Sequence, residues 1–241
     1  MAAFRGIVNI FFPWQLPAVL NGPAVMFDVV AASHNIAYLV SGASELYVAT
    51  RTNVHFALNE VPDALLIGEC EDSSLQGRFA SGNDASSVVN VDVRGKKIIL
   101  ITINGTHTLD EIWDKGAEPL ITVDYANIHS VAEWLLKERP NVEAITLVPS
   151  GGREKVFSSN PDLLEDLLCA ESMRCLLRGE EPDFKNNFVL SKRFIDQCYP
   201  QHWPTKQADL DLIFTDCDLY PVVPICEKST AGLMRIVNAY T

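Results

Sequence analysis

The sequence predicts an α/β protein, layered α/β/α around a largely parallel sheet. Short apolar runs rich in β-branched residues, typical of buried strands, recur along the chain, as at residues 98–103. Amphipathic stretches with a helical period, such as residues 128–138, separate these runs. Strands that alternate with helices indicate a parallel sheet, and right-handed crossovers bring most carboxyl ends of its strands to one edge.

Composition sets the size and the class of the protein. The chain has 241 residues, 48 % of them hydrophobic, enough for one large core, and we take residues 1–241 as a single domain. Its net charge is −12 and no basic run exceeds two residues, so neither nucleic acid nor a membrane is an expected partner. The six cysteines show no Cys-x-x-Cys spacing. We therefore expect a cytoplasmic protein with reduced thiols, and whether it forms a homo-oligomer is left open.

The first part of the chain supplies four expected strands and two helices. The strands cover residues 6–12, 24–30, 45–49 and 64–68, and the helices cover 36–40 and 53–59. Ser33 or Asn35 is placed to cap the first helix, and Glu69 follows the fourth strand directly. Residues 70–92 show weak periodicity, which predicts a long loop. Such loops are uncommon in compact domains, so we expect this one to be functional or a binding flap.

The strand at residues 98–103 ends in Asn104-Gly105-Thr106. Thr108 and Glu111 form a capping-box pattern, which predicts a helix over 109–115. A helix N-terminus after a strand and a polar turn is a common place for anion binding, although an ordinary turn explains the same residues. The remaining expected elements are strands at 120–123, 142–148 and 222–225 and helices at 128–138, 162–178 (opened by Asn160-Pro161), 188–198 and 208–216.

Acidic side chains are expected to gather at this edge of the sheet. Asp28 and Glu69 end strands, and Glu165-Asp166 lie on a later helix among leucines. Each has a simpler explanation: a turn cap for Asp28, a solvated loop residue for Glu69, a solvated helix face for the pair. Taken together, carboxylates beside an anion-type turn fit a site for a hard divalent cation with oxygen ligands.

Five segments in sequence carry a family resemblance. They are Asp28-Val29-Val30-Ala31-Ala32-Ser33, Gly68-Glu69, Phe79-Ala80-Ser81-Gly82-Asn83, Ile101-Thr102-Ile103-Asn104-Gly105-Thr106 and Leu164-Glu165-Asp166-Leu167-Leu168-Cys169-Ala170. Their order and spacing resemble the 2-phosphosulfolactate phosphatase family of coenzyme M biosynthesis, most strongly over residues 24–178. The resemblance implies a layered α/β fold and a magnesium-dependent phosphatase that releases phosphate from a sulfonated, phosphorylated lactate.

The resemblance also assigns roles to residues. Asp28, Glu69, Glu165 and Asp166 are the expected catalytic carboxylates, and Asp28, Glu69 and Asp166 are expected to hold Mg²⁺ and its water. The small anionic phosphorylated substrate is expected to contact Asn83, Asn104, Gly105, Thr106, His107, Ser150 and Gly151.

Among the departures from the family pattern, three remove an arginine. Ala31, Cys70 and His107 stand where the family usually carries arginine, whose planar fork binds phosphate and carboxylate bidentately. Arg78, Arg153 and Lys155 belong to loops of the same edge, where they either replace the missing cations or are simply solvated. Three hypotheses follow: the family's phosphatase activity, a phosphatase with another phosphoester substrate, or a catalytically silent relative that binds a ligand or partner.

Overall fold

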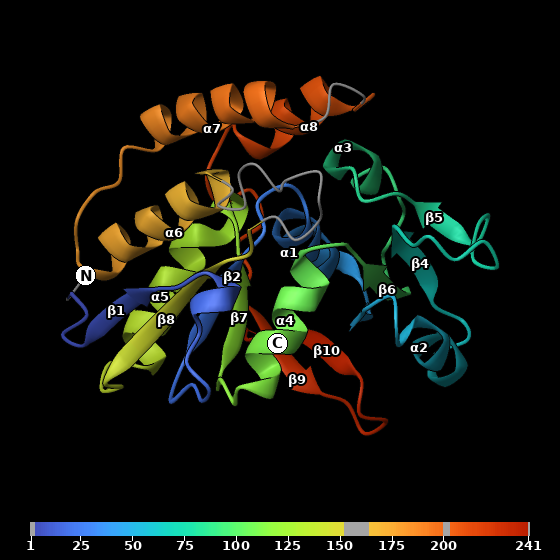
Figure 1. Ribbon diagram of the computed structural model, residues 1–241, viewed down its shortest axis with the longest axis horizontal. Coiled ribbons are helices and arrows are strands. Elements are labelled where there is room, and N and C mark those ends of the chain that lie inside the picture. Colours follow the sequence, from blue (N-terminus) through green and yellow to red (C-terminus); the bar gives the residue numbers. More distant parts are fainter. Residues whose placement is uncertain (1–2, 152–163, 200–202, 241) are drawn as a thin grey trace.

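The computed structural model describes residues 3–151, 164–199 and 203–240. Ten strands form one mostly parallel sheet in the order β1-β8-β2-β7-β9-β10-β3-β6-β4-β5, with helices packed against it (Figure 1). The strands are β1 (Ile7–Ile10), β2 (Ala24–Phe27), β3 (Glu45–Ala49), β4 (Leu65–Gly68), β5 (Phe79–Ser81), β6 (Lys97–Ile101), β7 (Leu120–Val123), β8 (Ala144–Pro149), β9 (Pro224–Lys228) and β10 (Met234–Asn238). The α/β class expected from the sequence is confirmed.

Eight α-helices and two short 3₁₀ helices lie in the described part of the chain. The α-helices are α1 (Ala32–Gly42), α2 (Val54–Glu60), α3 (Ala85–Val88), α4 (Gly105–Asp114), α5 (Ile128–Glu138), α6 (Leu164–Leu177), α7 (Phe184–Cys198) and α8 (Lys206–Ile213). The 3₁₀ helices are η1 (Pro13–Gln15) and η2 (Tyr125–Asn127).

The sheet consists of two parallel halves joined by a hairpin. Strands β1, β8, β2 and β7 are mutually parallel, as are β3, β6, β4 and β5. Strands β9 and β10 pair antiparallel with each other and with β7 and β3, so the two halves run in opposite directions along the sheet. A twist of about 20–25° per strand accumulates to roughly 100–125° between β2 and β6. Because of this rotation, the strands of the two halves lie at a smaller angle to each other than the roughly 180° of a flat antiparallel arrangement.

Central strands bury both faces, because alternate side chains point to opposite sides. In β2, Val25 and Phe27 face a core formed with α5 and α6, whereas Ala24 and Met26 face a core formed with α1 and α4. Strands β3, β6 and β4 also contribute to this second core, and α2 covers their other face. Helices α1 and α4 are therefore shared by the two halves, and they lie between them in Figure 1.

Two helices begin earlier than the sequence indicated. Helix α1 starts at Ala32 rather than at residue 36, and α4 starts at Gly105 rather than after a cap at Thr108. The cause is the Asp28 carboxylate, which accepts the first backbone N–H of both helices and is distant in sequence from α4. Thr108 lies buried inside α4, and its hydroxyl is 2.8 Å from that of Ser150.

Residues 70–92 were expected to be a long loop that is functional or a binding flap, and the loop assignment was wrong because they contain β5 and α3. β5 pairs with β4 and so extends the sheet, and Ala85 and Val88 of α3 are fully buried. Strand β10 has no counterpart among the expected elements; only Ile236 in it is buried, so the strand lacks a strong apolar signal. The expected helix start at Asn160-Pro161 lies outside the described residues.

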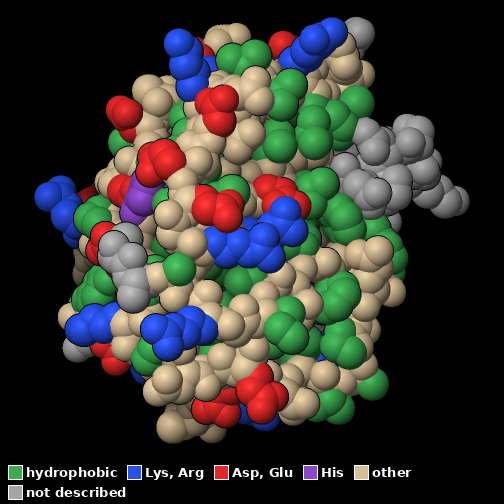
Figure 2. All heavy atoms as spheres, turned by 90° about the vertical axis from the view of Figure 1, so that its left-hand side faces the viewer, with side chains coloured by type: hydrophobic (Ala, Val, Ile, Leu, Met, Phe, Trp, Pro, Cys, Tyr) green, Lys and Arg blue, Asp and Glu red, His purple; other side chains and the backbone are tan. Residues whose placement is uncertain are grey.

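The surface at the β1 edge of the sheet carries mixed charge. In Figure 2, Lys and Arg side chains are interspersed with Asp and Glu, and hydrophobic side chains gather over the right-hand half of this face. The described residues visible here therefore form no continuous basic surface. No helix among residues 3–151, 164–199 and 203–240 is both long and apolar enough to span a membrane.

Candidate active site

A cleft with a volume of about 390 Å³ lies at the carboxyl ends of strands from both halves of the sheet. Asp28 follows β2, Glu69 follows β4 and Asn104 follows β6, and all three line the cleft. The sequence therefore placed these three side chains together correctly. The other lining residues are Val30, Ala31, Gly82, Asn83, Asp84, Thr102, Ile103, Tyr199, Trp203 and Pro204. This volume suits a small ligand.

Asp28 stands where the N-termini of α1 and α4 meet. Its carboxylate accepts backbone N–H groups of Gly105 and Ala32. A Cβ atom at position 105 would lie 2.5 Å from Asp28 Oδ2 and 2.6 Å from Ala32 Cβ, so only glycine fits there. Asp28 thus receives the positive ends of two helix dipoles. The turn predicted to bind an anion already binds a carboxylate of the protein itself.

Glu69 is held at the cleft by a close approach of two strand ends. Gly68 has φ +117°, and a Cβ atom there would lie 1.8 Å from the Ile101 carbonyl oxygen. The next residue, Glu69, donates its backbone N–H to the same oxygen at 3.0 Å. Glycine is therefore required at position 68, both for its φ and for space. The exposed Glu69 side chain is presented beside Thr102, which also lines the cleft.

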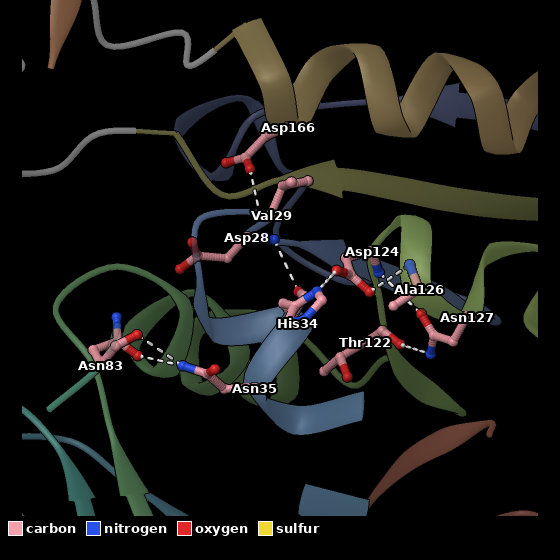
Figure 3. A network of polar contacts seen from close by, with 11 residues as sticks. Asp28, Val29, His34, Asn35, Asn83, Thr122, Asp124, Ala126, Asn127 and Asp166 are labelled. Carbon is pink, nitrogen blue, oxygen red and sulfur yellow. Dashed lines mark hydrogen bonds and ion pairs between the residues drawn. The ribbon is translucent and has the colours of Figure 1, made fainter. Parts of the chain in front are cut away.

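Glu165 and Asp166 lie behind the cleft, fully buried in the first turn of α6. Asp166 accepts the backbone N–H of Val29 at 2.8 Å (Figure 3). It also accepts that of Gly151 at 3.2 Å, and the two bonds tie α6 to the ends of β2 and β8. Glu165 Oε1 accepts the hydroxyl of Tyr199. Its other oxygen, Oε2, is buried and has no partner among the described residues.

Asp28, Glu165 and Asp166 form what we call the carboxylate cluster. Burial, and then the charge of Glu165, raises the pKa of Asp28 to about 7, and burial raises the pKa of Glu165 to about 7. Burial, and then the charges of Glu165 and Asp28, raises the pKa of Asp166 well above its usual range. Three buried acids that repel one another titrate as a unit, and a cation nearby favours their ionised forms.

The chemistry of the carboxylate cluster suits a hard cation. Oxygen ligands, mutual repulsion and the unpartnered Glu165 Oε2 all favour a positive ion. Among the described residues, no three Asp, Glu, His or Cys side chains converge as a complete metal site. Mg²⁺, however, is usually bound by one or two carboxylates, with water and substrate phosphate in the other positions. Asp28 and Glu69, which interact electrostatically at the cleft, supply such a pair.

The expected substrate contacts separate into two groups. Asn83 and Asn104 line the cleft, and Asn83 accepts both hydrogens of the Asn35 amide through Oδ1 and its carbonyl oxygen (Figure 3). Four of the others make contacts within the protein. Gly105 and Gly151 donate N–H groups to carboxylates, Thr106 bonds to Thr102, and Ser150 bonds to Thr108. His107 is not among the lining residues.

The three positions that lack the family's arginine differ in location. Ala31 lines the cleft, whereas Cys70 packs against the hydrophobic core under α2. Arg78 is exposed and does not line the cleft, and Arg153 and Lys155 lie outside the described residues. The described lining therefore contains no Lys or Arg, and its charged members are Asp28, Glu69 and Asp84.

Sequence reasoning missed the residues contributed by the link between α7 and α8. Tyr199 and Trp203 line the cleft, and a buried aspartate of α8, Asp209, accepts the indole N–H of Trp203 at 2.8 Å. The aromatic, proline-containing run at residues 199–204 is the available signal, since it interrupts two helical patterns. The partner of His34, Asp124, was also missed; this buried pair, with His34 Nδ1 and Asp124 Oδ2 at 2.7 Å, does not line the cleft (Figure 3).

Comparison with known proteins points to one family. A family model described as 2-phosphosulpholactate phosphatase matches residues 13–208. A "Probable 2-phosphosulfolactate phosphatase" of Parasynechococcus marenigrum (strain WH8102) is 33% identical over 171 residues, 69% of this chain and 66% of that protein. Proteins with the same name from Prochlorococcus marinus (strain MIT 9303) and Carboxydothermus hydrogenoformans are 30% identical over 164 residues and 34% identical over 144 residues.

The match with the Prochlorococcus protein covers 66% of this chain and 63% of that protein. The match with the Carboxydothermus protein covers 59% of this chain and 57% of that protein. The matches thus span between 57% and 66% of the length of these three relatives. The family model covers most of the chain, including Asp28, Glu69, Asn104 and the Glu165-Asp166 pair. The chain therefore belongs to the 2-phosphosulpholactate phosphatase family.

Proposed function

We propose that the chain is a Mg²⁺-dependent phosphatase that hydrolyses a small phosphomonoester in the cleft at Asp28. The observation that carries this proposal is the carboxylate cluster with Glu69 beside it, because these acids need a cation to ionise together. The relatives' name makes 2-phosphosulfolactate, a small phosphorylated acid, the first substrate to test, with sulfolactate and phosphate as products. A cytoplasmic location and a place in coenzyme M biosynthesis remain predictions.

In this proposal each residue has a distinct task. Asp28 and Glu69 would hold the ion at the cleft, and Asp166 fixes the backbone of Val29 and Gly151 around them. The amide groups of Asn83 and Asn104, both in the lining of the cleft, would contact phosphoryl oxygens. When bound, Mg²⁺ would polarise the phosphoryl group and offset its charge. Hydrolysis of a phosphomonoester needs this help because the uncatalysed reaction is very slow.

Glu165 has no surface at the cleft and acts through Tyr199. The Tyr199 hydroxyl donates to Glu165 Oε1, and Tyr199 itself lines the cleft. Glu165 therefore positions Tyr199 and adds negative charge behind Asp28. Tyr199→Phe separates these two effects, since it removes the hydrogen bond and leaves the charge.

The alternative of another phosphoester substrate is favoured by one observation. Apart from Mg²⁺, the described lining offers no positive group for the carboxylate and sulfonate of 2-phosphosulfolactate. Each hydrogen bond to a charged group contributes about 1.5–3 kcal/mol. The absence of two such bonds would lower affinity for this substrate by roughly two to four powers of ten, at about 1.4 kcal/mol per decade.

A panel of phosphomonoesters tests the proposal. Phosphate release is measured for 2-phosphosulfolactate, 3-phosphoglycerate and p-nitrophenyl phosphate, with Mg²⁺ and with EDTA. The proposal expects turnover of at least one ester with Mg²⁺ and its loss in EDTA. Equal turnover in EDTA would contradict the role of Mg²⁺, and no turnover of any ester would favour a silent ligand-binding relative.

A further inference from the structure

The part of the cleft away from the carboxylate cluster has its own chemistry. We call Asp84, Trp203 and Pro204 the outer wall; all three line the cleft. Tyr199 connects the outer wall to the carboxylate cluster, because its hydroxyl bonds to Glu165 and its ring centroid lies 6.0 Å from that of Trp203. One row of contacts therefore leads from the buried acids to the outer wall.

A buried aspartate fixes the outer wall in place. Asp209 is fully buried, and it accepts the Trp203 indole N–H at 2.8 Å and the Ser86 backbone N–H at 2.7 Å. The Thr205 hydroxyl lies 2.7 Å from Asp209 Oδ2 and 2.9 Å from Asp84 Oδ1. These contacts join α8 to α3 and to Asp84 just before it, so Trp203 and Asp84 keep a defined relative position.

Asp84 is left short of donors by this network. A hydroxyl carries one proton, so Thr205 serves either Asp84 or Asp209 at a given moment. Asp209 has two further N–H donors, whereas Asp84 pairs with no Lys or Arg of the described residues. The half-buried Asp84 carboxylate therefore faces the cleft with incomplete compensation, beside an aromatic ring.

We propose that the outer wall binds a positively charged group of the substrate, so that the substrate is the phosphomonoester of an amino alcohol or a quaternary-ammonium alcohol. The ammonium group lies beside Asp84 and against Trp203, a combination of carboxylate and aromatic ring that recognises organic cations. The phosphoryl group lies at Asp28 and Asn104. This inference rests on the proposed phosphatase function and names the substrate class of the same cleft.

Matched esters that differ in the charge of their alcohol test this inference. Phosphate release with Mg²⁺ is measured for phosphocholine, phosphoethanolamine, glycerol 1-phosphate, 3-phosphoglycerate and 2-phosphosulfolactate. The expected result is kcat/KM at least about tenfold higher for the two cationic esters than for the two anionic ones, with glycerol 1-phosphate between. Asp84→Asn, which keeps an oxygen for Thr205, is expected to reduce that ratio to below about threefold. Asp92→Asn is the matched control, because Asp92 is exposed and outside the cleft.

The outcomes separate the inference from the proposed function. Higher kcat/KM for the anionic esters, or a cationic preference that Asp84→Asn leaves unchanged, would overturn the inference while the phosphatase function stands. If no ester, p-nitrophenyl phosphate included, is hydrolysed, the proposed function fails. Calorimetric titration with choline then decides the inference alone. Binding that Asp84→Asn weakens supports it, and no binding, or equal binding by both proteins, overturns it.

Discussion

The two ends of the cleft differ in burial and in how their acids are held. At the carboxylate cluster, Asp28, Glu165 and Asp166 are almost completely buried, and backbone N–H groups hold Asp28 and Asp166. At the outer wall, Asp84 is half-buried and is held by one threonine hydroxyl. The first end is built into the sheet and two helix N-termini. The second depends on a link between α7 and α8.

This difference separates chemistry from selectivity. The buried end keeps the carboxylates, the turn and the glycines that the family resemblance pointed to. Of the three positions where the family usually carries arginine, Ala31 lines the cleft, whereas Cys70 and His107 do not. Changes at the carboxylate cluster should therefore abolish turnover, whereas changes at the outer wall should alter which ester is turned over.

Asp28→Asn is expected to have the largest effect. The amide keeps the shape of the side chain but removes a charge that would hold the cation, so kcat/KM should fall at least about 100-fold, as for loss of one preorganised electrostatic group. Steady-state phosphate release on the best ester measures this, with circular dichroism to confirm folding. Asp92→Asn, at an exposed site, should keep full activity. Turnover by Asp28→Asn within threefold of wild type would remove Asp28 from the chemistry.

Gly105→Ala tests whether the two helix N-termini must approach Asp28 so closely. The new methyl group would lie 2.5 Å from Asp28 Oδ2, so the carboxylate or α4 has to move. Overpacking of this kind usually costs about 1–3 kcal/mol of unfolding free energy. The free energy of unfolding, measured by urea denaturation, should fall by this amount. The value of kcat/KM should fall by roughly tenfold, which corresponds to about 1.4 kcal/mol.

Gly42→Ala is the control for this change, since its Cβ atom would lie no closer than 3.2 Å to Val93. It should alter stability less than Gly105→Ala and leave turnover unchanged. Equal losses in both variants would mean that the contact with Asp28 has no special role.

The carboxylate cluster should make stability depend on pH when no metal is present. Burial raises the pKa of Glu165 from 4.5 to about 7, so between these values the folded state keeps a proton that the unfolded chain has lost. The free energy of unfolding in EDTA should therefore decrease as the pH rises through this window. Glu165→Gln carries no charge at any pH and should show a smaller decrease.

Urea denaturation at pH 5, 6, 7 and 8 measures this dependence. Glu171→Gln is the control on the same helix, because Glu171 is partly exposed and pairs with Arg174. A pH dependence in Glu165→Gln as steep as in wild type would show that this carboxyl does not carry the buried proton.

Arg78→Ala should have the smallest effect. Arg78 is exposed and outside the described lining of the cleft, so it does not replace a missing arginine. Values of kcat/KM for anionic and cationic esters should both remain within about twofold of wild type, a difference of roughly 0.4 kcal/mol. A selective loss with the anionic esters would show that Arg78 reaches the substrate.

Strand positions were predictable because they rest on local patterns. Short apolar runs located β2, β4 and β6, and their ends located Asp28, Glu69 and Asn104. Helix starts were less predictable, since Asp28 caps α4 from a different strand and no local pattern encodes that contact. The opposite direction of the two halves depends on β10, whose side chains are mostly half-buried.

The arrangement of the outer wall was not predictable from local patterns. Its geometry depends on contacts between distant segments, such as Ser86 with Asp209, which are 123 residues apart in the sequence. Residues 199–204 also lack helical or strand periodicity. Sequence patterns therefore identified the framework of the site and its acids, and only the fold revealed which side chains face the ligand.

Titration of Mg²⁺ into wild type and Asp28→Asn by calorimetry at pH 7.5 tests the central claim most directly. We expect saturable binding to wild type and binding to Asp28→Asn that is at least about tenfold weaker, because ligand carboxylates dominate the affinity of hard cations. No binding to wild type, or equal binding to both proteins, would contradict a magnesium site at Asp28 and Glu69.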